Sequence, residues 1–142
     1  MAADTHRFVT LGRVEEGVYV ATNARGNELR FGSNDPDGFS PVELLMAAIA
    51  GCSAIDVDIV TGRRSPAETF QARVDATYVR DDTGNSLDDI TLTIDVTFPV
   101  GGRGDAAREI LPRTVARSHD RLCTVTRTIE LGRQVRTVVV EP

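Results

Sequence analysis

The segment SPVELLMAAIAGCSAIDVDIV, residues 40–60, is the least polar long stretch of the chain, and it contains one of the two cysteines, Cys52. Ser40 can cap a helix and Pro41 suits the first turn of one. Glu43 follows Ser40 by three residues, as in a capping box. The sequence therefore predicts a long helix that begins near residue 41 and ends around the segment TGRRSP, residues 61–66.

Apolar side chains recur along this helix at three- and four-residue spacing: Leu45, Ile49, Cys52, Ile55 and Ile59. Such spacing predicts one apolar stripe that faces the core, with Cys52 in the stripe. Free cysteine is among the most buried residue types, so Cys52 can be a small core side chain. The alternative is that Cys52 is a nucleophile.

The flanking segments alternate in the manner of strands. Three short runs at residues 7–12, 17–22 and 28–32 are separated by turn-forming residues and predict antiparallel strands. Two longer runs with period-two alternation, residues 69–80 and 88–100, predict a hairpin joined by the polar segment 81–87.

The C-terminal third combines helical and extended patterns. Residues 104–123 predict a second long helix, which Pro112 either kinks or divides. Residues 124–132 predict a short helix that Gly132 stops, and residues 134–141 predict a strand.

Composition limits the class of protein. A chain of 142 residues, 41% of them hydrophobic, predicts one domain spanning 1–142. The net charge of −5, with arginines scattered among acids, argues against a nucleic acid partner. We expect a cytoplasmic protein, because no signal peptide and no apolar run of about 18 residues is evident. In a reducing cytosol the two cysteines are packing, metal or redox groups rather than a permanent disulfide.

The helical segment 40–57, the hairpin after it, and the final segment SHDRLCTVTRTIELGRQV, residues 118–135, together resemble the OsmC/Ohr family of thiol-dependent peroxide reductases. The resemblance covers nearly the whole chain. Its most specific parts are the Pro-x-Glu-Leu-Leu start, the Ala-Gly-Cys-Ser-Ala-Ile-Asp turn and the cysteine after the second long helix. It implies an α+β, OsmC-like fold in which antiparallel sheets pack around two long central helices of an intertwined homodimer, with active sites at the interface.

The resemblance also implies roles for the cysteines. Cys52 would attack a small organic hydroperoxide and become a sulfenic acid, and Cys123 would condense with it to form a disulfide. Neither a bound cofactor nor a metal is implied. An external thiol or dithiol, such as that of a lipoylated protein, would regenerate the enzyme.

The resemblance also draws attention to two residues near the activating positions of the peroxide-reducing branch, Arg13 and Glu43. Arg13 matches the activating arginine, although an exposed turn arginine is the alternative. Val42 occupies the place of the activating glutamate, and the adjacent Glu43 lies nine residues before Cys52, on the opposite side of a regular helix. Glu43 is thus either part of the site or only a capping acid.

The surroundings of a reactive Cys52 set further conditions. An apolar environment raises the pKa of a thiol, so the thiolate requires a cationic partner. Asp56, one turn after Cys52, would destabilise a thiolate; binding an arginine or capping the backbone is its alternative role. His119 is a candidate base or metal ligand, but the chain lacks the paired spacing of zinc ligands.

Two functions of different class are consistent with these patterns. The first is a cysteine peroxidase for organic hydroperoxides. The second is a non-enzymatic dimer of the same fold that binds a small apolar or electrophilic ligand in its interface pocket.

Overall fold

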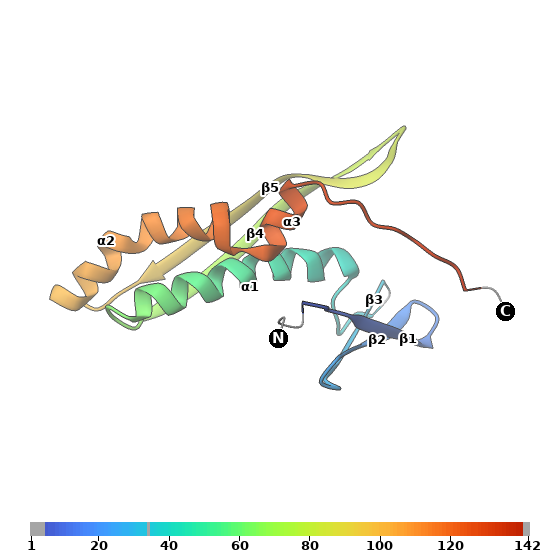
Figure 1. Ribbon diagram of the computed structural model, residues 1–142, viewed down its shortest axis with the longest axis horizontal. Helices are drawn as coiled ribbons and strands as arrows, with labels where there is room; N and C mark the ends of the chain where they lie inside the picture. The colour runs from blue at the N-terminus through green and yellow to red at the C-terminus, as the bar shows by residue number, and fades with distance from the viewer. Residues whose placement is uncertain (1–4, 34, 141–142) are drawn as a thin grey trace. The chain divides into compact units, whose positions relative to one another are not determined.

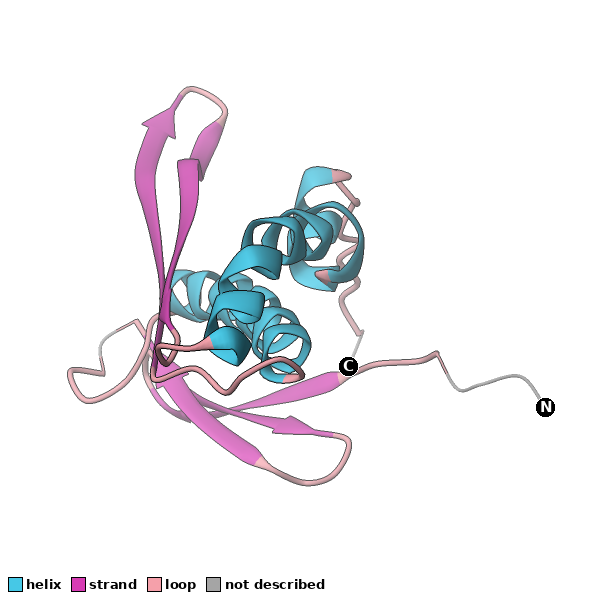
Figure 2. Cartoon of the chain, turned by 90° about the vertical axis from the view of Figure 1, so that its left-hand side faces the viewer, coloured by secondary structure: helices cyan, strands magenta, loops and turns pink. Residues whose placement is uncertain are grey.

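The computed structural model describes residues 5–33 and 35–140 (Figure 1). The chain forms two compact units, residues 1–45 and 46–142, which are described separately below. Figure 2 distinguishes the helices, in cyan, from the strands, in magenta. The expectation of a single OsmC-like domain stays a prediction.

The first unit contains an antiparallel sheet in the order β1-β2-β3. Its strands are β1 (Val9–Glu15), β2 (Val18–Asn23) and β3 (Glu28–Gly32). Gly17 has a φ of 78° in the turn between β1 and β2, a conformation that glycine adopts without steric cost. The three predicted strands are therefore confirmed.

Helix α1 (Pro41–Gly62) begins in the first unit and continues into the second. The backbone N–H of Ser40 donates to Oε1 of Glu43 at 2.9 Å, and the N–H of Glu43 donates to Oγ of Ser40 at 3.2 Å. These two bonds are the predicted capping box. Both bonds join residues only three apart, which is why the start of α1 was predictable from sequence.

The apolar composition of α1 also corrects an expectation about membranes. By length and composition alone, this 22-residue helix could cross a membrane, although the sequence analysis found no such run. Core helices of soluble proteins meet the same criterion, so it is weak evidence for a membrane span. Asp56, in the second half of α1, accepts a hydrogen bond from the hydroxyl of Ser118 in the same unit, which is a packing contact within the protein.

The buried face of α1 differs from the predicted stripe. The buried residues are Ile49, Ser53, Val57 and Thr61. Ile49 belongs to both sets, but Ile55 is 61% exposed and Ile59 is 55% exposed. The row of buried residues repeats every four positions and includes two hydroxyls, of which Thr61 donates to the carbonyl of Val57. Periodicity of apolar residues could not identify a face that contains polar side chains.

The second unit contains the hairpin of β4 (Thr69–Asp81) and β5 (Gly84–Thr97). Phe70 pairs with Val96, Ala72 with Ile94 and Val74 with Leu92, so apolar residues of both strands lie on one face. The hairpin is confirmed. The polar segment 81–87 is mostly strand rather than loop, because residues 84–87 continue the pairing with β4.

Three helical elements follow the hairpin: α2 (Gly102–Arg117), the π-helical turn η1 (Ser118–Leu122) and α3 (Thr124–Glu130). Pro112 lies inside α2 and does not divide it. Gly132 has a φ of 63° and its N–H bonds to the carbonyl of Ile129, so α3 ends where the sequence predicted. The long helices α1 and α2 exist, but their central position in a dimer stays a prediction.

The predicted C-terminal strand is wrong for this chain by itself. Residues 133–140 form no strand, and position 141 of the predicted range lies outside the described residues. The side chains of Val135, Val138, Val139 and Val140 are largely exposed. A β-branched, alternating segment becomes a strand only when another strand supplies its hydrogen bonds, and the described part of the chain supplies none to it.

Candidate active site

The two cysteines, 71 positions apart in sequence, come together in the second unit. Cys52 lies in the middle of α1, and Cys123 lies at the junction of η1 and α3. Both thiols are free, and they lie close enough for each to shift the pKa of the other. Cys52 is half-buried, whereas Cys123 is fully buried. A small reactant from solvent can therefore reach Cys52 more readily than Cys123.

The backbone positions Cys123 as the cap of α3. Its N–H donates to the carbonyl of Ser118 at 2.8 Å, which closes the π-helical turn, and its extended conformation then ends that turn. The Sγ of Cys123 accepts the backbone N–H of Thr126 at 3.4 Å. The hydroxyl of Thr126 lies 3.3 Å from the same sulfur. A hydroxyl accepts a bond from a thiol and donates one to a thiolate, so Thr126 suits both protonation states.

The environment lowers the pKa of Cys123. Burial alone raises it, but the hydrogen bonds from Thr126, Cys52 and Ser53 together outweigh burial and hold the pKa of the Cys123 thiol below its ordinary value. These groups all favour the charged form of the sulfur. Cys123 is therefore the more acidic of the two thiols.

The pKa of Cys52 shifts the other way. Burial raises it, the backbone N–H of Val125 partly offsets that effect, and the thiol of Cys52 donates its proton toward Cys123. The amides of the first turn of α3 thus serve both sulfurs. The cationic partner expected for a Cys52 thiolate is not among these groups, since none of the groups shifting either thiol pKa is an arginine, and the pKa of Cys52 is raised.

The other two predicted site residues belong to the first unit. Arg13 is exposed on β1, opposite Tyr19. Glu43 binds the N–H of Ser40, a hydrogen bond that lowers the pKa of the Glu43 carboxyl. The structure thus gives Glu43 a capping role. Any contribution of Arg13 or Glu43 to the reactivity of Cys52 stays a prediction.

Asp56 and His119 have structural partners. Oδ2 of Asp56 accepts from the hydroxyl of Ser118 at 2.8 Å, a bond that ties η1 to α1 and differs from the arginine or backbone partner expected. His119 contacts Asp120 at 3.0 Å and Glu130 at 3.3 Å. The hydrogen bond with Asp120 is the main cause of the raised pKa of His119. No group of three potential metal ligands occurs among the described residues.

A largely apolar cavity of about 950 Å³ lies next to the cysteine pair, although neither cysteine lines it and four carboxylates do, those of Asp88, Asp89, Asp120 and Glu130. It is lined by residues of α1, α2, α3 and β5, and it reaches Ser53 and Thr126, both of which contact Cys123. Its volume is that of a typical small-molecule site. The sequence analysis missed Ser53 and Thr126. Their positions, one after Cys52 and three after Cys123, were the available signs.

The opposed pKa shifts predict that the thiol pair loses its first proton at a pH below the ordinary pKa of cysteine and its second proton at a pH above it. Thr126→Val should raise the lower pKa, because the hydroxyl that stabilises the Cys123 thiolate is removed. Thr128→Val is the matched control, since the Thr128 hydroxyl binds the carbonyl of Thr124. Ultraviolet absorbance of the thiolate, recorded as a function of pH, measures the lower pKa in both variants. An unchanged lower pKa in Thr126→Val would contradict the assignment.

The same shifts fix the sign of the pH effect on stability. The pKa of Cys123 is lower in the folded protein than in the unfolded chain, where a thiol has a pKa of about 8.5. Between these two pKa values the folding stability rises with pH, because only the unfolded chain still binds the proton. The pKa of Cys52 is higher in the folded protein than in the unfolded chain, so the folding stability falls as the pH rises from the unfolded thiol pKa to the folded pKa of Cys52. The contribution of the pair is therefore largest near the unfolded thiol pKa, where the folded pair holds one proton.

Comparisons with known proteins agree on one family. A family model described as OsmC-like protein matches residues 32–138. An uncharacterized protein of Mycobacterium tuberculosis is 32% identical over 126 residues, which cover 87% of this chain and 88% of that protein.

Two solved structures share the fold. An OsmC-like protein of unknown function from Vibrio cholerae aligns with a TM-score of 0.71 at 11% identity, covering 89% of this chain and 95% of that one. A protein of Legionella pneumophila, named as an organic hydroperoxide resistance protein OsmC, aligns with a TM-score of 0.59 at 15% identity, covering 90% and 91%. The mixed α+β architecture with antiparallel sheets matches these neighbours.

Proposed function

Because the chain belongs to the OsmC-like family, we propose that it is a thiol-dependent peroxidase that reduces organic hydroperoxides with Cys52 and Cys123. The observation that carries the proposal is the proximity of these two free cysteines, each of which shifts the pKa of the other, beside a largely apolar cavity. The cavity would hold the hydrocarbon body of the substrate, and its peroxide group would point to the pair.

The reaction begins with a proton transfer inside the pair. Cys52 passes its proton to the Cys123 thiolate and becomes the nucleophile. Its sulfur attacks the distal peroxide oxygen, the O–O bond breaks, and the alkoxide leaves as an alcohol after taking up a proton. Cys52 is now a sulfenic acid, oxidised by two electrons.

The second step closes the disulfide. Cys123, again deprotonated, attacks the sulfur of the Cys52 sulfenic acid, and the hydroxide leaves as water. One hydroperoxide and two thiols thus give one alcohol, one water and one disulfide. An external dithiol, such as the lipoyl group of a partner protein, returns the pair to the reduced state. Burial of Cys123 protects it from direct oxidation and suits this resolving role.

We also propose that the protein acts as a cytoplasmic homodimer. Two observations support the dimer. Ile55 and Ile59 expose one apolar edge of α1, and the valine-rich segment 133–140 is extended without a strand partner. A second copy would cover the isoleucines and supply an edge strand to the segment. Arg13 of one copy would then be available to the cysteine pair of the other.

A thiol count tests the peroxidase proposal against the non-enzymatic alternative. One equivalent of cumene hydroperoxide added to the reduced protein should remove both free thiols within the dead time of manual mixing, with cumyl alcohol as product. The control is the same protein with cumyl alcohol, which has the same apolar body but no O–O bond. Persistence of both thiols would favour a ligand-binding protein.

A further inference from the structure

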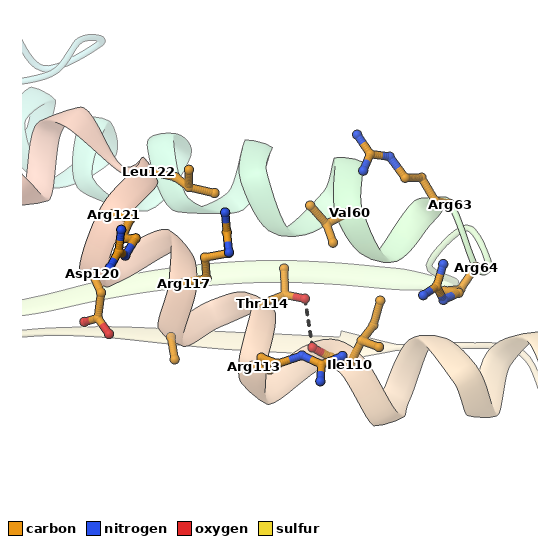
Figure 3. Close-up of a pocket in the computed structure, with 11 residues that line it drawn as sticks. Val60, Arg63, Arg64, Ile110, Arg113, Thr114, Arg117, Asp120, Arg121 and Leu122 are labelled. Carbon is orange, nitrogen blue, oxygen red and sulfur yellow. Dashed lines mark hydrogen bonds between the residues drawn. The ribbon is translucent and has the colours of Figure 1, made fainter.

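Five arginine side chains line one cleft of the second unit, between the C-terminal end of α1 and the helices α2 and η1 (Figure 3). Arg63 and Arg64 follow the last turn of α1, and Arg113, Arg117 and Arg121 come from α2 and η1. The cleft has a volume of about 600 Å³. A single acid, Asp120, is among the residues that line it, all of which are described.

The five guanidinium groups have no partner in the described part of the chain. None of them forms an ion pair or a side-chain hydrogen bond within residues 5–33 and 35–140. Other arginines of the protein do find carboxylates: Arg73 binds Asp75 and Arg108 binds Asp105. Asp120 is already in contact with His119. Within the described residues, the five positive charges of the cleft therefore face a single carboxylate, that of Asp120, which is also shared with His119.

Structural needs explain only part of this charge. Arg63 and Arg64 interact favourably with the carbonyl end of α1, as basic residues at a helix C-terminus do. Arg113, Arg117 and Arg121 follow each other at four-residue intervals, an arrangement in which like charges repel. The protein has a net charge of −5 and 21 acidic residues, yet almost none of these neutralises the cleft. An anionic ligand would remove the repulsion.

The chemistry of the lining selects the class of ligand. Guanidinium groups bind phosphate oxygens through two parallel hydrogen bonds, and several of them match a group with several negative charges. Val60, Ile110 and Leu122 add an apolar surface to the same cleft. The volume lies in the range of small-molecule sites. We propose that this cleft binds an organic polyphosphate, a small molecule with at least two phosphate groups on a partly apolar body.

A long polyanion fits less well. The overall negative charge of the protein repels a nucleic acid or an anionic membrane outside the cleft, whereas a small ligand meets only the local field. The cleft contains neither cysteine, so anion binding can be tested independently of the proposed peroxidase activity. Through Arg121 and Leu122 it adjoins the turn that ends at Cys123.

The test is calorimetric titration of the reduced full-length protein with pyrophosphate, ATP and acetate. ATP and pyrophosphate should bind saturably with a Kd of about 1 mM or tighter, ATP more tightly because of its apolar contacts, and acetate should not saturate. Arg113→Gln with Arg117→Gln should weaken ATP binding at least about tenfold. Arg25→Gln with Arg80→Gln removes the same charge from two exposed positions that do not line the cleft, and should leave the Kd within about twofold.

Circular dichroism checks that the variants fold. If Arg113→Gln with Arg117→Gln does not fold, the fallback variant is Arg113→Lys with Arg117→Lys. It keeps the positive charge but loses the paired hydrogen bonds, and it should still weaken ATP binding measurably. The proposal is overturned if neither ATP nor pyrophosphate saturates the protein, or if both glutamine pairs weaken binding equally. It is also overturned if a short DNA duplex or phosphatidylserine vesicles bind more tightly than ATP and depend on the same arginines.

Discussion

Substitution of Cys52 by serine should abolish the consumption of organic hydroperoxide, whereas Cys123→Ser should still consume about one equivalent and then stop. The reason is the unequal access to the two sulfurs. Cys52 is half-buried, while Cys123 has no exposed surface. Without Cys123 the oxidised Cys52 has no partner with which to form a disulfide, so a sulfenic acid accumulates.

Mass spectrometry after treatment with hydroperoxide and dimedone measures the result. Cys123→Ser should carry one dimedone adduct, on Cys52, and the unsubstituted protein should carry none because its disulfide forms first. Cys123→Ser should also react more slowly than the unsubstituted protein, since serine does not accept the proton of Cys52. A dimedone adduct on Cys123 in the Cys52→Ser variant would show that the roles are reversed, with the thiolate of lower pKa attacking directly.

Substitution of Ile55 and Ile59 by aspartate should convert a dimer into a monomer. Burial of one isoleucine side chain contributes about 1.5–3 kcal/mol, so losing both contacts and adding buried charge should weaken association at least about 100-fold. Sedimentation at micromolar concentration distinguishes the two states. The fold of the chain should persist, because both side chains are already exposed in the single chain.

Val100→Asp is the matched control for this experiment. Val100 is fully exposed in the loop between β5 and α2, and the change has the same chemistry. The control should remain dimeric. A monomeric unsubstituted protein would remove the dimer from the proposal, and equal dissociation of both variants would show that added charge, rather than the α1 edge, is responsible.

The sequence predicted well those features that depend on neighbours a few residues away. The capping box of Ser40 and Glu43, the hairpin and the stop of α3 at Gly132 each rest on hydrogen bonds or backbone conformations within a short segment. The extended segment 133–140 shows the limit. Its composition favours a strand, but a strand needs a partner, and the choice of partner is not local.

The candidate site shows the same division. The sequence pointed to Cys52 and Cys123 but not to Ser53 and Thr126, the side chains that stabilise charge on Cys123. It also treated the arginines as scattered, although the four-residue spacing of three of them was visible in the chain. Their cleft is completed by Arg63 and Arg64, about fifty positions earlier, which only the packing of α1 against α2 brings alongside.

The sequence by itself determined where α1 begins, where the hairpin pairs and which two residues can perform thiol chemistry, since these follow from short-range hydrogen bonds and side-chain type. Only the tertiary structure decided which face of α1 is buried and which of the two thiols is the more acidic. Burial and pKa depend on all groups that packing places around an atom. For Cys123 these groups include Cys52 and Ser53, which lie on another helix.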